Sequence, residues 1–476
     1  MRYKFVSILC GALLLLSCGK STEVTIVDGS AGILPDEKPS NATTAQKTTS
    51  QDDFTVIKIG EPNSIHTLDP LFGTNNSEFR TLSLIYDGLT KIDMNGNVKP
   101  AIAKKWAISR DSLRYTFTIH DNVFYHSDSR FTSGIGRKVI PEDIIMNFER
   151  MASILVPDNA AEMFTSIKGF KTFHTEQTFI KIPANRTINS IEGITAPNDS
   201  TITIQLSKKD KDLLKKLAHP LASIYPKESL PTDKTPITKP IGTGSYYLAQ
   251  QKSKLLILAS NDDYFQSQEV PTRIDITHGK KEADLYQDFA KGNLDALIEI
   301  GPGTITQLTD STGKLDFMYQ SAFNLYDSSV KSEVNFYYNP QSESNNVETF
   351  LRSQKKDFLN FDRALGEVII KDPRSSVDSL EKQNVHIAFT DNPAEVYLTD
   401  AIAKKLAGNR ATVVMNSSYA ITDEVTFSTK YFPSARQTIV WKKPVLILTK
   451  EGVTGIKVSH YPWNISFDGS TITKSN

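Results

Sequence analysis

The two cysteines of this chain constrain how the rest of it can fold. Cys10 lies inside an apolar N-terminal run behind Arg2 and Lys4, and Cys18 ends that run. A basic start, a short apolar run and a small residue before the break are typical of a secretory signal, and the run is shorter than the roughly 20 residues that span a bilayer. We therefore predict a signal peptide over residues 1–17. The mature chain then keeps one thiol, so hydrophobic cores must stabilise it without a disulfide or a thiolate metal site.

Cys18 is also a predicted site of lipid attachment. Leu15 and Ser17 stand before it in a pattern that resembles a bacterial lipobox, in which the thiol receives a diacylglyceryl group and becomes the mature N-terminus. Each buried CH2 contributes about 0.8 kcal/mol, so two or three acyl chains hold a protein firmly at a membrane. We expect a lipid-anchored protein on the periplasmic side of the cell envelope. An ordinary signal peptide with an incidental cysteine is the alternative.

Length and charge set the broad class of the protein. The chain has 476 residues, 39% of them hydrophobic, and at roughly 100 to 200 residues per domain this predicts two or three domains. The 54 basic and 54 acidic residues balance, which gives no reason to expect nucleic acid as a partner. Residues 18–53 are polar and poor in aromatic side chains, and we predict a flexible linker there. An irregular loop packed on the first domain is the alternative for this stretch.

The periodicity of apolar residues predicts alternating strands and helices. A β-rich run predicts a strand over residues 54–59, and Phe79, Leu82 and Leu89 recur at helical spacing behind a cap at Asn75. Asn95 followed by Gly96 predicts a two-residue hairpin turn. Further strands are predicted at 114–119, 200–206, 255–258, 294–298 and 444–448, further helices at 213–217 and 283–290, and a strand-helix-strand unit at 385–389, 394–407 and 411–415. The fold class predicted from these elements is α/β.

Motifs of familiar catalysis are absent from the sequence. It contains no Gly-x-Ser-x-Gly elbow, no His-Glu-x-x-His pair and no Gly-x-x-x-x-Gly-Lys-Ser/Thr loop. His126 and Asp128 stand two residues apart, a spacing more typical of a polar turn than of a metal site. We therefore expect no enzyme activity, no cofactor and no metal. An envelope hydrolase is a distant alternative that would need a nucleophile and a base not evident here.

Several ordered blocks resemble the extracytoplasmic solute-binding proteins of the peptide/nickel family, which feed ABC importers. The matching blocks are LDP at residues 68–70, IYDGL at 85–89, VKPAIAKKW at 98–106, PEDIIMNFER at 141–150 and PIGTGSY at 240–246. Within them, Gly88 and Gly244 suit positions of unusual φ, and Asp143 can cap the helix that carries Phe148. The resemblance covers residues 54 to about 300.

The resemblance implies a two-lobed, periplasmic-binding-protein-like fold of the class II type. It consists of mixed sheets with flanking helices, and two lobes joined by crossover strands close on a ligand in the cleft between them. Lobe 1 is expected over residues 54–300 plus 440–476, and lobe 2, short and divergent, over 301–439. An additional loop at residues 133–139 separates two of the matching blocks. The matching blocks identify the scaffold rather than the ligand.

By the same resemblance, five residues are expected to bind ligand. They are Asn75, Asn76, Met163, Phe164 and Tyr431, whose alternatives are a helix cap for the asparagines, core positions for Met163 and Phe164, and a surface aromatic for Tyr431. The resemblance implies a monomeric, lipid-anchored receptor that delivers a peptide or similarly sized solute to an ABC permease. We find no acidic Asp-Pro loop of the kind that peptide binders use between residues 415 and 441, so the ligand class stays open. An envelope lipoprotein that acts in protein–protein interaction is the alternative function.

Overall fold

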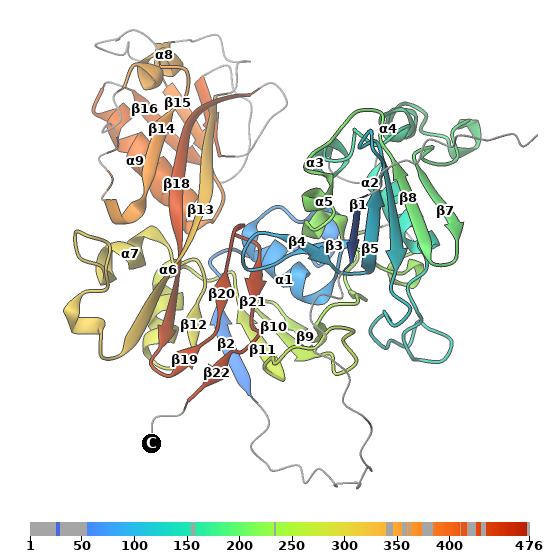
Figure 1. Ribbon diagram of the computed structural model, residues 1–476. Coiled ribbons are helices and arrows are strands. Elements are labelled where there is room, and N and C mark those ends of the chain that lie inside the picture. Colours follow the sequence, from blue (N-terminus) through green and yellow to red (C-terminus); the bar gives the residue numbers. More distant parts are fainter. Residues whose placement is uncertain are drawn as a thin grey trace, which may run out of the picture.

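The structure is a computed structural model that describes residues 25–28, 55–153, 158–232, 235–338, 346–354, 359, 361, 363–373, 384–409, 411–416, 425–429 and 435–473. The signal peptide predicted over 1–17, Cys18 and Tyr431 lie outside the described residues. Two large sheets with helices on their faces form a mixed α/β fold (Figure 1), as the sequence predicts. Within the described residues, no helix is long and apolar enough to cross a membrane.

A five-stranded sheet with its helices forms one end of lobe 1 (Figure 1). The strand order is β1-β5-β6-β8-β7, with all pairs antiparallel. The strands are β1 (Thr25–Asp28), β5 (Ala103–Ile108), β6 (Arg114–Ile119), β7 (Ile194–Asn198) and β8 (Thr201–Gln205), and the helices are α2 (Pro141–Met151), α3 (Asp158–Glu162), α4 (Phe170–Phe179) and α5 (Leu213–Lys216). Trp106 and Phe117 face α2 in the shared core, so alternation in the sequence correctly predicts the buried face of β6.

Part of the predicted linker differs from the structure. Residues 25–28, which fall inside the stretch predicted as a flexible linker over 18–53, form the edge strand β1 and pair antiparallel with β5. This four-residue run contains Ile26 and Val27, whose β-branched side chains favour a strand. The prediction relied on the average composition of residues 18–53, which does not reflect the short β-rich run at residues 25–28.

An eleven-stranded sheet runs through both lobes. Its order is β16-β15-β17-β13-β18-β12-β2-β11-β10-β9, and β14 also pairs with β18. The strands of lobe 1 are β2 (Val56–Gly60), β9 (Tyr246–Lys252), β10 (Leu255–Ser260), β11 (Arg273–Thr277) and β12 (Ala296–Leu297). The helix α1 (Asn76–Ile85) packs against these strands through Leu82 and Ile85, which belong to the same buried cluster as Ile57 and Ile59.

Two long crossover strands join the lobes, β13 (Phe323–Tyr338) and β18 (Arg436–Lys450), and pair antiparallel along almost their whole length (Figure 1). The ladder shifts between Asp327 and Lys331, opposite Leu446 and Pro444. Proline has no N–H to donate, so the interruption lies where one strand cannot complete the ladder. From the sequence, only residues 444–448 of this pair were predicted, because the polar residues in the middle of β13 obscure its alternation.

Lobe 2 is a smaller α/β unit that uses the other half of the sheet. It contains β14 (Glu367–Ile370), β15 (Asn384–Ala388), β16 (Thr412–Asn416), β17 (Val425–Ser428), α7 (Pro302–Leu308), α8 (Asn346–Ser353) and α9 (Pro393–Ala407). Parallel pairing of β15 with β16 on either side of α9 confirms the predicted strand-helix-strand unit. The boundary predicted at residue 300 does not separate the hydrophobic cores of the two lobes. Leu285 and Phe289 of α6 (Glu282–Ala290) precede this boundary but pack in the core of lobe 2.

Short elements complete lobe 1. The strands β3 (Thr90–Ile92) and β4 (Val98–Pro100) form the predicted hairpin, in which Gly96 has a φ of 80°. Near the C-terminus, β19 (Val453–Thr454) pairs with β22 (Thr471–Ile472), and β20 (Lys457–Val458) pairs with β21 (Ile465–Ser466). The 3-10 turns are Pro70–Phe72, Pro183–Asn185, Pro220–Ala222, Lys227–Ser229, Phe317–Tyr319 and Arg363–Leu365.

Gly88 and Gly244 are needed for close approach rather than for unusual φ. Neither has a positive φ, so the prediction from sequence was wrong about the cause. A Cβ on Gly88 would lie 2.2 Å from the carbonyl oxygen of Leu217, and one on Gly244 would lie 2.4 Å from that of Leu84. At both glycines two backbone segments pass each other with no room for a methyl group. Gly244 thereby packs directly against the end of α1, and Gly88 packs against the residue after α5.

We predict that Gly88→Ala lowers the free energy of unfolding by about 2 kcal/mol or more, because the added methyl group meets a backbone atom that cannot rotate away. Gly408→Ala is the matched control, since Gly408 is right-handed at the end of α9 and its nearest neighbour would be 3.4 Å away. The control should be neutral or up to about 1 kcal/mol more stable. Urea denaturation of both variants measures the difference, and equal stabilities would contradict this reading.

Candidate functional site

The loop formed by residues 61–66, here called the junction loop, leaves β2 and faces lobe 2. The start of α1 holds it in place. Asn75 caps α1 by accepting from the backbone N–H of Glu78 at 3.0 Å, and Glu78 accepts in return from that of Asn75 at 3.3 Å. The amide of Asn75 donates to the carbonyl of Ser64 at 3.1 Å, and Glu78 accepts from the N–H of His66 at 2.9 Å. The predicted cap is confirmed, and it also fixes the junction loop.

His278 supports the junction loop from the other side. Its Nδ1 accepts from the backbone N–H of Ile65 at 3.2 Å, which requires a neutral ring with the proton on Nε2. Burial, with the nearby charges of His66 and Lys254, lowers the pKa of His278 to about 4. The ring therefore stays neutral and keeps this hydrogen bond at ordinary pH.

Lobe 2 meets the junction loop through the start of α9. The Ser64 hydroxyl donates to Asp391 Oδ2 at 2.9 Å, and the amide of Asn392 donates to Asn63 Oδ1. Asn392 Oδ1 also caps α9, accepting from the N–H groups of Ala394 at 2.8 Å and Glu395 at 3.2 Å. Both hydrogen bonds join polar side chains of the two lobes.

Four charged side chains form a buried cluster beside this junction. Arg80 donates to both carboxylate oxygens of Glu61, from Nε at 2.8 Å and from Nη2 at 2.6 Å, and its Nη1 donates to Glu299 Oε2 at 3.0 Å. Lys443 Nζ lies 3.5 Å from Glu299 Oε1. The side chains of Arg80 and Glu61 are 1% exposed, that of Lys443 is 3% and that of Glu299 is 6%. Two positive and two negative charges balance within the cluster.

The environment keeps Glu299 ionised although it is buried. Burial by itself raises its pKa, but the charges of Lys443 and Arg80 outweigh that effect and lower the pKa of Glu299 to about 2. Burial lowers the pKa of Lys443, and Glu299 opposes this shift. Glu299 also has a φ of 52°, a left-handed conformation that costs a residue with a side chain about 1 to 3 kcal/mol. The ion pairs hold it there.

The cluster marks the point at which the crossover strands pass between the lobes. Ser332 on β13 is the register partner of Lys443 on β18. Asn76, at the start of α1, donates to the hydroxyl of Ser332 at 3.3 Å and lies 3.5 Å from Glu299 Oε2. The same few side chains therefore join α1, the segment just after β12 and both crossover strands.

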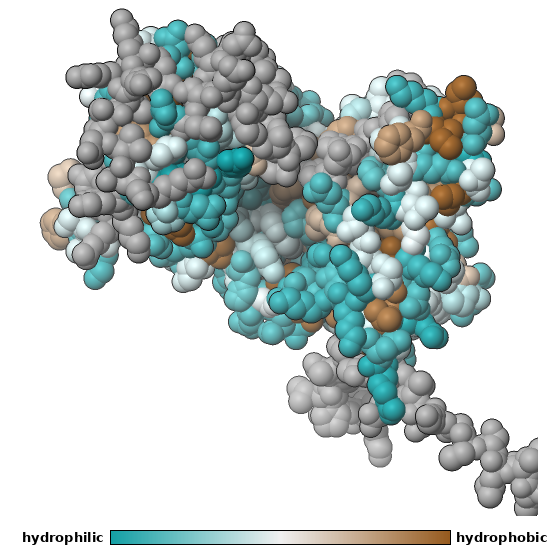
Figure 2. Space-filling model, turned by 90° about the horizontal axis from the view of Figure 1, so that it is seen from above, coloured by the Kyte–Doolittle hydropathy of each residue, from teal (hydrophilic) through white to brown (hydrophobic). Residues whose placement is uncertain are grey.

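Little space remains between the lobes where they touch. Two cavities of about 20 and 10 Å³ lie beside Glu299, Pro62 and Pro393, each with room for about one water molecule. Away from the contact, the surface is hollowed between the part over lobe 2 and the part over the five-stranded sheet (Figure 2). No group of three or more His, Cys, Asp or Glu side chains in the described ranges could hold a metal ion.

The predicted ligand-binding residues have different surroundings. Asn75 and Asn76 lie at the junction of the lobes, with Asn75 occupied as the cap and Asn76 bonded to Ser332. Phe164 is fully buried and packs edge-on against Phe148 at 5.2 Å, so its assignment to a cleft wall is wrong. Met163 packs against the same core. These two positions follow their alternative as core residues.

The charged cluster was not predicted from the sequence. The signal for Lys443 was a lysine within the apolar part of β18, between Trp441 and Val445, both fully buried. Arg80 shares the buried face of α1 with Ser77 and Leu84, three residues before it and four after it. A charge inside an apolar pattern indicates a buried partner. The partners come from distant segments, so the pairing itself could not be read from the sequence.

The fold defines the class of protein. Solved structures with the same fold include the murein tripeptide binding protein of Escherichia coli, with a TM-score of 0.67, 12% identity, and coverage of 87% of this chain and 99% of that one. The fold is therefore the class II periplasmic-binding-protein fold predicted from the sequence. A match at this identity shows the fold alone.

Residues 97–352 match the family model described as bacterial extracellular solute-binding proteins, family 5, middle region. This match covers more than half of the chain. The protein belongs to family 5 of the bacterial extracellular solute-binding proteins, the peptide/nickel family.

Curated relatives match over parts of their length. The chain is 34% identical over 79 residues to dipeptide-binding protein DppE of Bacillus subtilis, which is 17% of this chain and 14% of that protein. It is 24% identical over 267 residues to heme-binding protein A of Haemophilus influenzae, which is 54% of this chain and 46% of the relative. The chain thus spans less than half of the length of these two curated relatives.

We predict that Glu299→Gln lowers the free energy of unfolding at pH 7 by about 3 kcal/mol, because it leaves Lys443 buried without its carboxylate. The ordinary pKa of Glu299 is 4.5 and its folded pKa is about 2, so its contribution is complete above pH 4.5 and is lost as the pH falls toward 2. The difference between parent and variant should therefore shrink between pH 5 and pH 3. Urea denaturation at several pH values measures it.

Glu451→Gln is the matched control, because Glu451 is exposed at a turn. It should change stability little at any pH. If the difference in free energy of unfolding between the parent and Glu299→Gln stays constant down to pH 3, the ionised carboxylate is not the source of the stabilisation.

Proposed function

We propose that this protein is the lipid-anchored substrate-binding component of an ABC importer, and that it captures a peptide or similarly sized solute between lobe 1 and lobe 2. Family membership supports the general role of solute binding. The observation that carries the finer proposal is the polar junction, where Asn63 and Ser64 face Asp391 and Asn392. These groups come from both lobes, as closure on a ligand requires.

The junction offers chemistry that suits a peptide terminus. Asp391 is an exposed carboxylate bonded to one hydroxyl, so it retains acceptor capacity for an ammonium group. The amides of Asn63 and Asn392 can exchange their mutual hydrogen bond for bonds to a peptide backbone. The relatives named above are a dipeptide-binding protein, a heme-binding protein and a murein tripeptide binding protein, and this favours a small solute over a larger partner.

The crossover strands supply a way for the lobes to move. The ladder is interrupted between Asp327 and Lys331, and Ser329 within that interval has a φ of 60°. On its lobe 2 side, the charged cluster fixes Lys443 and Ser332 to lobe 1. Because the cluster ties these two residues to lobe 1, movement of lobe 2 requires the strands to bend on the lobe 2 side of the cluster, beyond Ser332 and Lys443.

We predict that a di- to pentapeptide raises the thermal midpoint of the full chain. A ligand at 100 times its Kd adds about 2.7 kcal/mol to the stability of the folded form, which is a shift of several degrees. A thermal-shift screen against defined peptides, nickel-histidine, heme and sugars checks this, and calorimetry with the best ligand gives its Kd. A screen without any shift would contradict solute binding.

The Asp391→Ala variant tests whether the junction carries that binding. Loss of a hydrogen bond to a charged group costs about 1.5 to 3 kcal/mol, so peptide affinity should fall about tenfold or more. Asp400→Ala, on the same lobe but paired with Lys404 on the surface of α9, is the control and should bind as the parent does. Equal affinities for the two variants would place the ligand elsewhere.

Lipid attachment at Cys18 is a separate prediction. Cells fed an alkyne fatty acid should yield a labelled protein that fractionates with membranes, because the acyl chains supply the anchoring energy. Cys18→Ser should abolish the label and release the protein from the membrane fraction, whereas Cys10→Ser should not. Labelling that survives Cys18→Ser would show that the signal is of the ordinary kind.

A further inference from the structure

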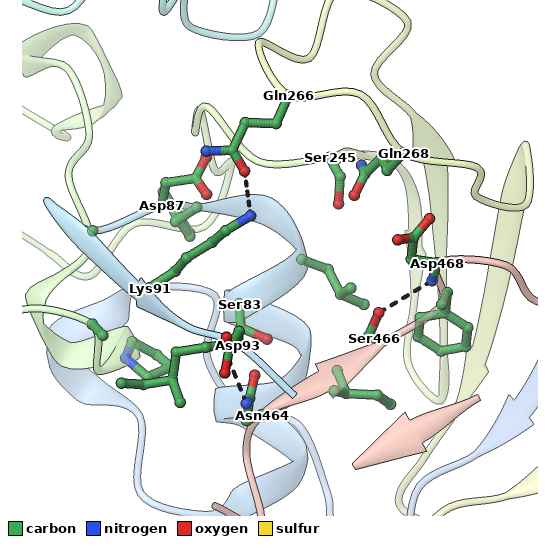
Figure 3. Close-up of a pocket in the computed structure, with 18 of the residues that line it drawn as sticks. Ser83, Asp87, Lys91, Asp93, Ser245, Gln266, Gln268, Asn464, Ser466 and Asp468 are labelled. Atoms are coloured by element: carbon green, nitrogen blue, oxygen red, sulfur yellow. Dashed lines mark hydrogen bonds between the residues drawn. The ribbon is translucent and has the colours of Figure 1, made fainter. Parts of the chain in front are cut away.

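A cavity of about 300 Å³ lies inside lobe 1, apart from the junction loop. Its walls are the end of α1, strand β3, residues 264–268 and the C-terminal residues 463–468 (Figure 3). Every residue that lines it belongs to lobe 1, and none belongs to the junction loop. Closure of the lobes is therefore not required to form this cavity.

Opposite charges face each other across the cavity. Lys91 rises from β3 on one side, and Asp468 lies on the other side, with Ser245 and Gln268 above them in Figure 3. Lys91 donates to the side-chain carbonyl of Gln266. Asp468 Oδ1 accepts from the backbone N–H of Glu269 at 2.9 Å. The cavity thus presents an ammonium group and a carboxylate that are not paired with each other.

A second carboxylate balances Lys91 in the wall. Asp87 accepts from the hydroxyl of Thr243 at 2.9 Å and from that of Tyr264 at 3.1 Å. Burial raises the pKa of Asp87. Burial lowers the pKa of Lys91, although Asp87, Asp468 and Asp93, which also lines the cavity, oppose that shift. Burial thus outweighs these carboxylates, and a ligand carboxylate bonded directly to the ammonium group of Lys91 would further lower the free energy of its charged form.

The lining retains free hydrogen-bonding capacity. The ammonium group of Lys91 has three N–H donors, and only one of them donates to an acceptor among the described residues. The side chains of Ser245 and Gln268 make no hydrogen bond within that part of the chain. Asp468 has its Oδ2 available. These groups surround a space at the lower limit of small-molecule pockets, about 300 Å³. Such a volume suits a ligand of about the size of one amino acid.

We infer that this cavity is a second binding site, for a small zwitterion of the α-amino acid class, whose carboxylate binds Lys91 and whose ammonium group binds Asp468. Ser245 and Gln268 contribute neutral hydrogen bonds to the same ligand. The inference stands independently of the proposed transport function, because the walls of this cavity contain no residue of lobe 2. Simultaneous occupation by a peptide at the junction and an amino acid here is then expected.

Calorimetry on the full chain with glycine and each neutral L-amino acid tests the inference. At least one should bind, and its amide, which lacks the carboxylate, and its N-acetyl form, which lacks the ammonium group, should each bind at least tenfold more weakly. Lys91→Met and Asp468→Asn should each weaken the amino acid at least tenfold. Lys252→Met and Asp199→Asn, both on the exposed surface, are the matched controls and should leave its Kd unchanged.

Three results would overturn the inference. They are the absence of binding by any amino acid in the panel, equal binding of the amide and N-acetyl forms, and displacement of the amino acid by a peptide that occupies the junction. Circular dichroism checks that each variant is folded, and Lys91→Gln replaces Lys91→Met if the latter unfolds. Binding of the amide and N-acetyl derivatives is measured with the parent protein, so it tests the inference even if both variants fail to fold.

Discussion

The ion-pair cluster of Glu61, Arg80, Glu299 and Lys443 is the interaction on which the arrangement of the two lobes depends. Burying four charges is costly, and the cost is offset only when each has a partner with good geometry. Arg80 meets this condition through its two-point contact with Glu61 and its bond to Glu299. Apolar residues of similar volume could stabilise the same site equally well. The cluster therefore acts chiefly by fixing one register of the crossover strands.

Fixing the register matters because no cross-link in the described chain does so. Three separate hydrophobic clusters lie along the two large sheets. The crossover strands form the longest connection between lobe 1 and lobe 2. β18 is buried on both faces, so a one-residue slip would exchange the side chains of its two faces and place Lys443 on the wrong face. The left-handed conformation of Glu299 shows that the site is over-determined, since the strain persists only where its neighbours hold it.

Local signals in the sequence predicted several of the individual elements. The cap at Asn75, the turn at Gly96 and the β15-α9-β16 unit were all predicted because each depends on neighbouring residues. β13 was missed since its middle is polar and interrupted. Phe164 was expected to bind ligand by resemblance to the family, although an aromatic residue in the sequence is equally consistent with a core position. Its burial includes a contact with Phe148 of α2, which no local pattern encodes.

The charged cluster and the lobe 1 cavity share one structural element, which connects their energetics. Arg80 Nη1 donates to the carbonyl of Pro462 at 2.6 Å, and the next residue, Trp463, begins the C-terminal wall of the cavity. Ser83, one turn further along α1, also lines that cavity. A ligand that moved residues 463–468 would thus act on the bond that positions Arg80. If the position of Arg80 differs between open and closed lobes, the two sites must influence each other equally in both directions, since coupling free energy is reciprocal.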